Sequence, residues 1–129
     1  MTGRVLTKKL ALGQRAERLA ADYLEQRGYS ILARNWRRPE GELDLVIGAN
    51  GLCVFVEVRS RTGVERGHPL ETVDARKRSR VIRAARLYLN EESPAAPVFR
   101  FDVVAVTFAL DDSPPEIEHI EDAFQAGSG

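Results

Sequence analysis

The sequence has little of several features that would point to particular classes of protein. Its one cysteine, Cys53, cannot form an internal disulfide, and its place in an apolar run suits a reducing compartment. No run approaches the ~20 apolar residues that span a bilayer, and the N-terminal segment lacks the apolar stretch of a signal peptide. We therefore expect a single cytoplasmic domain over residues 1–129 with no membrane partner, and with residues 1–11 and 125–129 flexible.

Motifs for several cofactors and catalytic groups are also missing. There are only two histidines, His68 and His119, so no zinc-ligand spacing exists. No glycine-rich phosphate loop follows a strand, and no hydrolase nucleophile elbow is present. The sequence thus gives no motif for an organic cofactor.

The chain has no net charge, with 19 Lys+Arg and 19 Asp+Glu, but the charges are sorted along it. Residues 59–86 carry nine basic and three acidic groups, whereas residues 87–129 carry one basic and nine acidic groups. Attraction to nucleic acid depends on local clusters of Lys and Arg, so the basic middle is compatible with that partner. The alternative is that the two segments neutralise each other across the fold.

Hydrophobic periodicity predicts an α/β fold in which helices flank a mixed central β-sheet. A helix is expected over 12–27, a short strand over 29–33 and a turn over 35–41. Two strands, 42–47 and 52–59, flank Asn50-Gly51, which is a strong hairpin signal. A loop over 60–70, a basic helix over 73–90, a strand over 99–108 and a small element over 117–124 complete the order.

The predicted hairpin places carboxylates opposite each other. A turn centred on Asn50-Gly51 sets Asp44 opposite Glu57 and Glu42 opposite Arg59. Opposed like charges are destabilising, and a divalent cation held by both carboxylates would offset the repulsion. The alternative is a solvated surface, but Glu57 interrupts the apolar run LCVFVEV, where an unpaired carboxylate is costly to bury.

Strand alternation and helical spacing add further expectations. Alternation puts Leu43, Leu45 and Ile47 together on the face opposite Asp44. Glu17 lies at the rim of the apolar face of the first helix, from which it could reach the carboxylate pair or remain solvated. Trp36 could stack on a base or cover a sheet edge.

These residues carry a resemblance to a known family. The chain resembles the bacterial YraN family over roughly residues 12–124, and that family is similar in fold to the PD-(D/E)xK nuclease superfamily, including the archaeal Holliday-junction resolvases. The matching positions are Gly13, Glu17, Tyr23-Leu24, Gly28-Tyr29, Ile31-Leu32, Asn35, GELDLV at 41–46, VFVEVRSR at 54–61, Lys77, Tyr88-Leu89 and RFDVVAV at 100–106.

The resemblance implies a restriction-endonuclease-like core and a catalytic site. By it, Asp44 is the motif aspartate, Glu57 the motif glutamate and Glu17 the acid from the first helix, and all three would bind Mg²⁺ or Mn²⁺. Asp102 matches a family position, and we expect it to bond a backbone amide or a neighbouring site residue rather than to be catalytic.

One motif position departs from the family pattern. The superfamily has Lys two residues after the glutamate, where this chain has Arg59. Lysine can lose its proton, whereas arginine stays charged, so Arg59 could stabilise charge on phosphorus but could not act as a general base. Its alternative role is an ion pair with Glu42. Lys77 could replace the motif lysine in part, contact phosphate or be solvated.

Together with the resemblance, the carboxylate pair and the basic segment lead us to expect a metal-dependent nuclease-like protein that binds DNA and hydrolyses phosphodiester bonds. The resemblance to resolvases implies that this DNA is branched or otherwise structured. The residues expected to hold backbone phosphates are Arg61, Arg66, Arg76, Lys77 and Arg80. Alternatives are a nucleic-acid-binding or interaction module that has lost cleavage, and a protein whose basic helix docks on an acidic partner. By analogy with resolvases, a homodimer is a further expectation.

Overall fold

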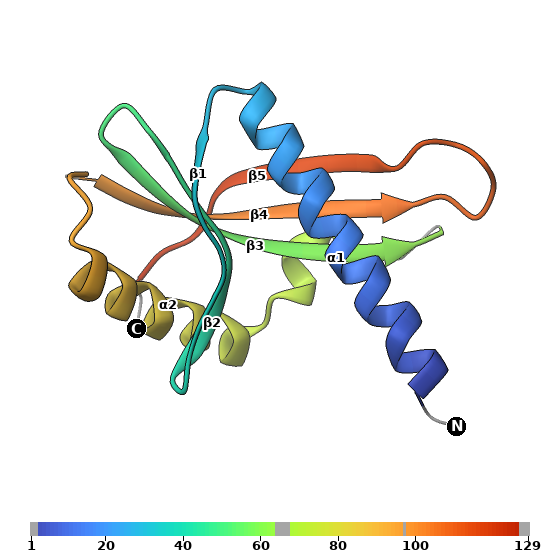
Figure 1. The fold of residues 1–129 in the computed structure, drawn as a ribbon, viewed down its shortest axis with the longest axis horizontal. Coiled ribbons are helices and arrows are strands. Elements are labelled where there is room, and N and C mark those ends of the chain that lie inside the picture. The colour runs from blue at the N-terminus through green and yellow to red at the C-terminus, as the bar shows by residue number, and fades with distance from the viewer. Residues whose placement is uncertain (1–2, 64–67, 97, 127–129) are drawn as a thin grey trace.

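The computed structural model describes residues 3–63, 68–96 and 98–126. Helix α1 (Gly3–Gln26) precedes the strands β1 (Ser30–Arg38), β2 (Gly41–Ala49) and β3 (Leu52–Thr62). After β3 come a short 3-10 helix (Pro69–Thr72), helix α2 (Ala75–Glu92) and the strands β4 (Val98–Phe108) and β5 (Glu116–Phe124). The strands form one sheet in chain order, in which β3 and β4 are parallel and the other neighbours antiparallel (Figure 1). The predicted α/β fold is confirmed.

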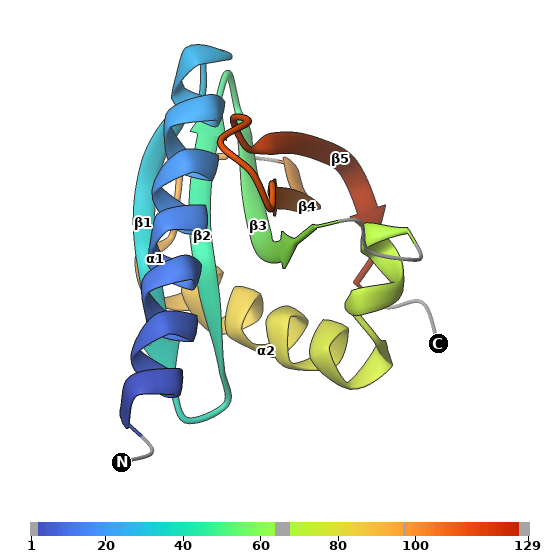
Figure 2. The same ribbon diagram turned by 90° about the vertical axis from the view of Figure 1, so that its right-hand side faces the viewer.

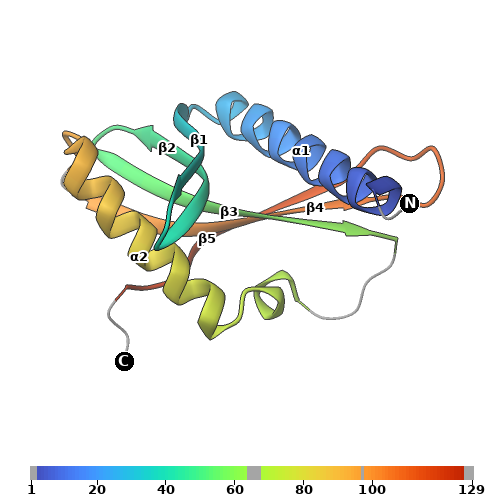
Figure 3. The same ribbon diagram turned by 60° about the horizontal axis from the view of Figure 1, so that its bottom comes forward.

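The two helices cover opposite faces of the sheet (Figure 3). On one face, Ala20 and Leu24 of α1 pack with Val54 of β3. On the other, the ring of Phe55 lies 5.8 Å from that of Tyr88 in α2, centroid to centroid. Helix α2 supplies the crossover that parallel strands need, because no tight turn can join them. No helix in the described part of the chain is long and apolar enough to cross a membrane.

The hairpin between β2 and β3 has the predicted register. Asn50 and Gly51 have φ angles of 43° and 79°, as a two-residue turn of type I′ requires. The strands pair from Ala49↔Leu52 to Leu45↔Val56. This short-range signal therefore sets which residues of the two strands meet.

Several element boundaries differ from expectation. Helix α1 begins at Gly3, so the segment 3–11, expected to be flexible, is helical. The expected turn over 35–41 is wrong, because β1 continues to Arg38 before the chain reverses. Strand β3 continues to Thr62, and the small C-terminal element is a full edge strand, β5.

Side-chain alternation breaks near Asp44. Leu43 packs in the core on the α2 side, whereas Leu45 packs on the α1 side, so the prediction that they share a face is wrong. Asn35, on the neighbouring strand, has a φ of 49°, a left-handed conformation that asparagine tolerates and that interrupts a regular pleat. Figure 1 shows the β1–β2 hairpin curving steeply across the other strands.

The start of β2 packs directly against α2. A Cβ added at Gly41 would overlap the backbone carbonyl oxygen of Arg80, so only glycine fits this approach without a shift. Figure 2 shows α2 crossing beside the end of the β1–β2 hairpin. The contact brings the acidic part of β2 next to the basic surface of α2.

Candidate functional site

The structure brings Asp44 and Glu57 together where β2 and β3 separate. The ladder between these strands ends at Leu45↔Val56, and Asp44 Oδ2 then accepts a hydrogen bond of 2.8 Å from the Val58 backbone N–H. Glu57 is 4% exposed, and its carboxyl group shares a hydrogen bond with that of Asp44. The predicted carboxylate pair is therefore present.

The electrostatics of the pair differ from those of surface acids. Burial raises the pKa of Glu57 to about 7, and the Asp44 carboxylate adds to the rise. Burial also raises the pKa of Asp44, although the hydrogen bond from Val58 opposes this. Both shifts favour the protonated over the ionised form of these acids.

Lys77 of α2 supplies the cation at this pair. Its Nζ lies 2.9 Å from Glu57 Oε1, and the positive charge lowers the pKa of Glu57 against the effect of burial. The side chain of Asp74 accepts a hydrogen bond from the Lys77 backbone N–H and caps the helix. This cap fixes where α2 begins and therefore the position of Lys77 in its first turn. Lys77 thus contacts the glutamate of the pair, and its expected parts in place of the motif lysine or at phosphate stay predictions.

Arg59 does not form the ion pair expected from the register. Glu42 instead pairs with Arg37 of β1 at 3.1 Å, because β2 has left β3 by this point and remains paired with β1. Arg59 Nε donates a hydrogen bond of 3.1 Å to Thr72 Oγ1, while its Nη1 lies 3.8 Å from Glu57 Oε1. Arg59 therefore ties β3 to the 3-10 helix, a contact that the spacing of the sequence did not indicate.

Glu17 lies beside Asp44 on the α1 side of the sheet. Burial and the Asp44 carboxylate raise the pKa of Glu17, and a hydrogen bond with Asn35 opposes them. Its Oε2 atom is buried without a hydrogen-bond partner in the described structure. Glu17 is thus a neighbour of the pair, and its part in metal binding stays a prediction.

The donor set fits a hard divalent cation. Within the described residues, no group of three or more His, Cys, Asp or Glu side chains is arranged to hold a metal ion. Mg²⁺, however, is usually bound through one or two carboxylates together with water and phosphate oxygens. Asp44 and Glu57 supply two carboxyl groups that meet this requirement once both are ionised, and Glu17 supplies an oxygen without a hydrogen-bond partner in the described structure.

A cleft of about 230 Å³ opens from Glu57 toward α2. Its walls include two of the predicted phosphate-binding residues, Arg76 and Arg80, as well as Lys77. Arg61 is half-buried on β3 and does not line this cleft, and Arg66 falls outside the described residues. The structure thus brings three of the five predicted basic residues to the cleft that Glu57 lines.

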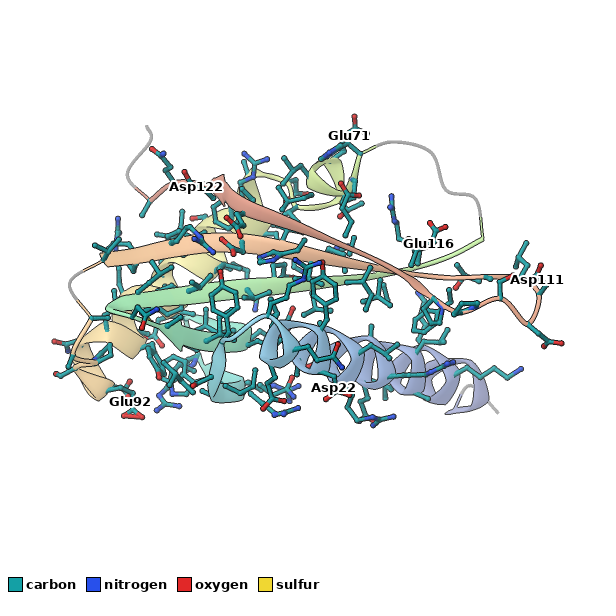
Figure 4. All side chains as sticks on the ribbon, turned by 90° about the horizontal axis from the view of Figure 1, so that it is seen from above. Asp22, Glu71, Glu92, Asp111, Glu116 and Asp122 are labelled. Carbon is teal, nitrogen blue, oxygen red and sulfur yellow. The ribbon has the colours of Figure 1, made fainter. Side chains whose placement is uncertain are left out.

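The acidic tail does not pair with the basic helix. In the described chain, no ion pair joins an arginine of α2 to an acid of residues 93–126, and His68, which precedes the helix, lies 4.0 Å from Glu118 of the tail. Figure 4 shows Asp111 and Glu116 at the β4–β5 hairpin, well away from the end of α2 marked by Glu92. Direct neutralisation by the tail therefore does not account for the basic surface of α2.

Asp102 anchors a second buried polar cluster. Its carboxylate accepts hydrogen bonds of 2.8 Å from Arg100, lies 2.7 Å from His119 Nε2 and accepts the Asp122 backbone N–H at 3.0 Å. Burial alone would raise the pKa of Asp102, but the bonds from His119 and Arg100 hold it below its usual range. The expected backbone amide bond is confirmed, whereas the role of His119 carried no sequence signal.

Trp36 has a structural place in the fold. Its ring meets that of Tyr88 edge to face at 5.4 Å, and the guanidinium of Arg38 lies 4.0 Å from its centroid. It is half-buried on β1, which is an edge strand. Of the two expectations for Trp36, covering the sheet edge is confirmed.

The fold and the site together define a class of protein. A five-stranded mixed sheet with a helix on each face and an acidic pair on adjacent central strands is consistent with a restriction-endonuclease-like core. The chain belongs to the family described as Uncharacterised protein family UPF0102, whose model matches residues 16–106. This is the YraN family of the resemblance, and it is commonly assigned to the PD-(D/E)xK nuclease-like superfamily.

Curated relatives support the assignment over nearly the whole chain. A UPF0102 protein of Pelotomaculum thermopropionicum is 45% identical over 113 residues, which are 88% of this chain and 94% of the relative. One from Pseudomonas aeruginosa is 45% identical over 115 residues, 88% of this chain and 92% of the relative. One from Anaeromyxobacter dehalogenans is 47% identical over 114 residues, 88% of this chain and 84% of the relative.

Proposed function

We propose that this protein is a nuclease that hydrolyses phosphodiester bonds of DNA with a divalent metal ion. The observation that carries the proposal is that Glu57, the buried neighbour of Asp44, lines a cleft whose walls also include Lys77, Arg76 and Arg80, together with Glu42 and Asp74. Carboxylate oxygens suit a hard cation, and guanidinium groups suit phosphate oxygens. The combination fits an anionic phosphodiester.

Asp44 and Glu57 would hold Mg²⁺ or Mn²⁺, which would activate water and polarise a phosphoryl oxygen. For this the two carboxyl groups must both be ionised, so a proton held by either has to leave. The ammonium of Lys77 favours the ionised form of Glu57, because an adjacent opposite charge stabilises a carboxylate. Glu17 adds an acidic oxygen next to Asp44.

Lys77 performs the role of the superfamily's motif lysine, the one two residues after the glutamate. Arg59 stays charged and is tied to Thr72, whereas the amine of Lys77 can both orient water and exchange a proton. Arg76 and Arg80, at the same cleft, hold backbone phosphates. By likeness to resolvases, we propose branched DNA as the substrate and a homodimer as the working form; the buried thiol of Cys53 suits the cytoplasm.

The test combines metal binding with cleavage. Mn²⁺ titration calorimetry followed by digestion of a labelled four-way DNA junction should show binding and cutting by the native protein, and loss of both in Asp44→Ala and Glu57→Ala. Asp22→Ala is the matched control, since Asp22 is exposed on the outer side of α1 (Figure 4). If the native protein binds no Mn²⁺ even with DNA present, the proposal is wrong.

A second candidate is a nucleic-acid-binding or interaction module that keeps this scaffold without cleaving. It is favoured by Arg59, which replaces a lysine and is held by Thr72. Arg59→Lys separates the two functions. A gain in junction cleavage would indicate a degenerate site, whereas a loss would indicate a site adapted to arginine and completed by Lys77.

A further inference from the structure

A second basic hollow lies on the other side of β2 from the α2 cleft. It has a volume of about 220 Å³ and is formed between α1, β1 and β2 by Gln14, Glu17, Arg18, Arg34, Asn35 and Leu45. Its two arginines come from different elements, Arg18 from α1 and Arg34 from β1. The expectations drawn from the sequence did not include either of them.

Arg18 and Arg34 have no charged partner among the residues that the structure describes. Both side chains are exposed, and within the described residues neither forms an ion pair, a hydrogen bond or a ring contact. The other two arginines of β1 are neutralised: Arg37 pairs with Glu42 at 3.1 Å, and Arg38 pairs with Glu91 at 2.6 Å. The hollow therefore presents two guanidinium groups that no ion pair among the described residues occupies, beside the single acid Glu17, whereas Arg37 and Arg38 have partners.

The hollow adjoins the carboxylate pair. Leu45, one of its lining residues, follows Asp44 directly in the chain, and Glu17, another lining residue, lies beside Asp44 on the α1 side of the sheet. The α2 cleft lies on the other side, where Glu57 meets Arg76 and Arg80. The acids of the site thus lie between the arginines of the hollow and those of the α2 cleft. This order suits a DNA backbone whose successive phosphates cross a cation site.

We propose that Arg18 and Arg34 bind a phosphate of the DNA backbone on the side of the carboxylate pair away from α2. The inference rests on the proposed function for its choice of ligand and extends it by a second phosphate-binding site. A DNA backbone that crosses the start of β2 would then be held on both sides of Asp44. The contacts are to phosphate, so they add affinity without sequence preference.

The test measures DNA binding in EDTA, so that cleavage does not enter. A fluorescein-labelled duplex of about 30 base pairs is titrated with the native protein and with Arg18→Gln/Arg34→Gln at several salt concentrations. Each phosphate contact contributes about 0.9 to the slope of log affinity against log salt. Loss of two contacts should lower the slope by about 2 and weaken binding about ten- to fiftyfold near 0.1 M salt.

A charge-matched control lies on the same helix. Lys8→Gln/Lys9→Gln removes two exposed cations about three turns before Arg18 and should leave the slope unchanged. The inference is overturned if the salt slope falls equally in both double variants, or if it does not fall in Arg18→Gln/Arg34→Gln. The second result would also be obtained if the hollow bound free phosphate but no DNA. Metal-dependent cleavage by an Arg18→Gln/Arg34→Gln protein with unchanged slope would leave the proposed nuclease intact while this inference fails.

Discussion

Replacing Glu57 with glutamine should stabilise the metal-free protein at alkaline pH and have little effect in acid. Glu57 is 4% exposed, and its pKa rises from 4.5 to about 7, chiefly through burial and then through Asp44. A raised carboxyl pKa means that the native state favours the protonated group. Its contribution is therefore fully present below pH 4.5 and is lost as the pH rises to about 7.

The size of the effect follows from the same values. A rise from 4.5 to about 7 corresponds to about 3 kcal/mol of unfolding free energy, which the native protein loses across this interval. Glutamine cannot ionise, so Glu57→Gln escapes the loss. The variant should match the native protein near pH 4.5 and exceed it by up to about 3 kcal/mol at pH 8.

Urea unfolding in EDTA, followed by circular dichroism at a series of pH values, measures the difference. Asp22→Asn removes a carboxylate from an exposed position and serves as the control, with a difference from native that stays flat. The reasoning is refuted if the advantage of Glu57→Gln is the same at pH 4.5 and pH 8. That result would mean that burial does not raise the pKa of Glu57.

Two further predictions concern the scaffold. Gly41→Ala should destabilise the protein by roughly 1–3 kcal/mol in urea unfolding, because the added methyl group overlaps the α2 backbone. Gly13→Ala is the control: nothing lies within 4 Å of the added methyl group, so this change should stabilise α1 by up to about 1 kcal/mol. Equal effects of the two substitutions would contradict the packing argument. Asp102→Ala should cost about 3–5 kcal/mol, because the buried carboxylate bonds Arg100, His119 and the Asp122 N–H, and Arg100 would keep only Tyr29 and the more distant Glu121. A cost of less than 1 kcal/mol, similar to that of Asp111→Ala at an exposed position, would show that water replaces the carboxylate.

The chemistry of the site depends on which cation lies nearest to the pair. A lysine two residues after Glu57 would come from the same strand, whereas Lys77 reaches Glu57 from α2 on the facing layer. Packing of α2 against Gly41 therefore controls the approach of the ammonium to the carboxylates. A shift of this helix should alter the pKa of Glu57 and the metal affinity together.

Local sequence determined the carboxylate pair. Asn50-Gly51 favours a tight turn with two positive φ angles, and strand pairing then fixes the register up to Leu45↔Val56. Asp44 and Glu57 follow the last pair of this ladder directly, so the register brings them to the point where β2 and β3 separate, and the Asp44 side chain then bonds the Val58 N–H. The helices and the mixed sheet likewise follow from hydrophobic periodicity, which acts within each segment.

Tertiary structure decided the partners of the charged groups. Arg59 binds Thr72, and Glu42 pairs with Arg37, because β2 leaves β3 beyond Leu45 and remains with β1. The contact of Lys77 with Glu57 depends on the docking of α2, and the hollow at Arg18 depends on the docking of α1. Spacing along a chain specifies a turn or a helix face, but the meeting of long side chains from different layers depends on sheet twist and helix packing, which no single segment encodes.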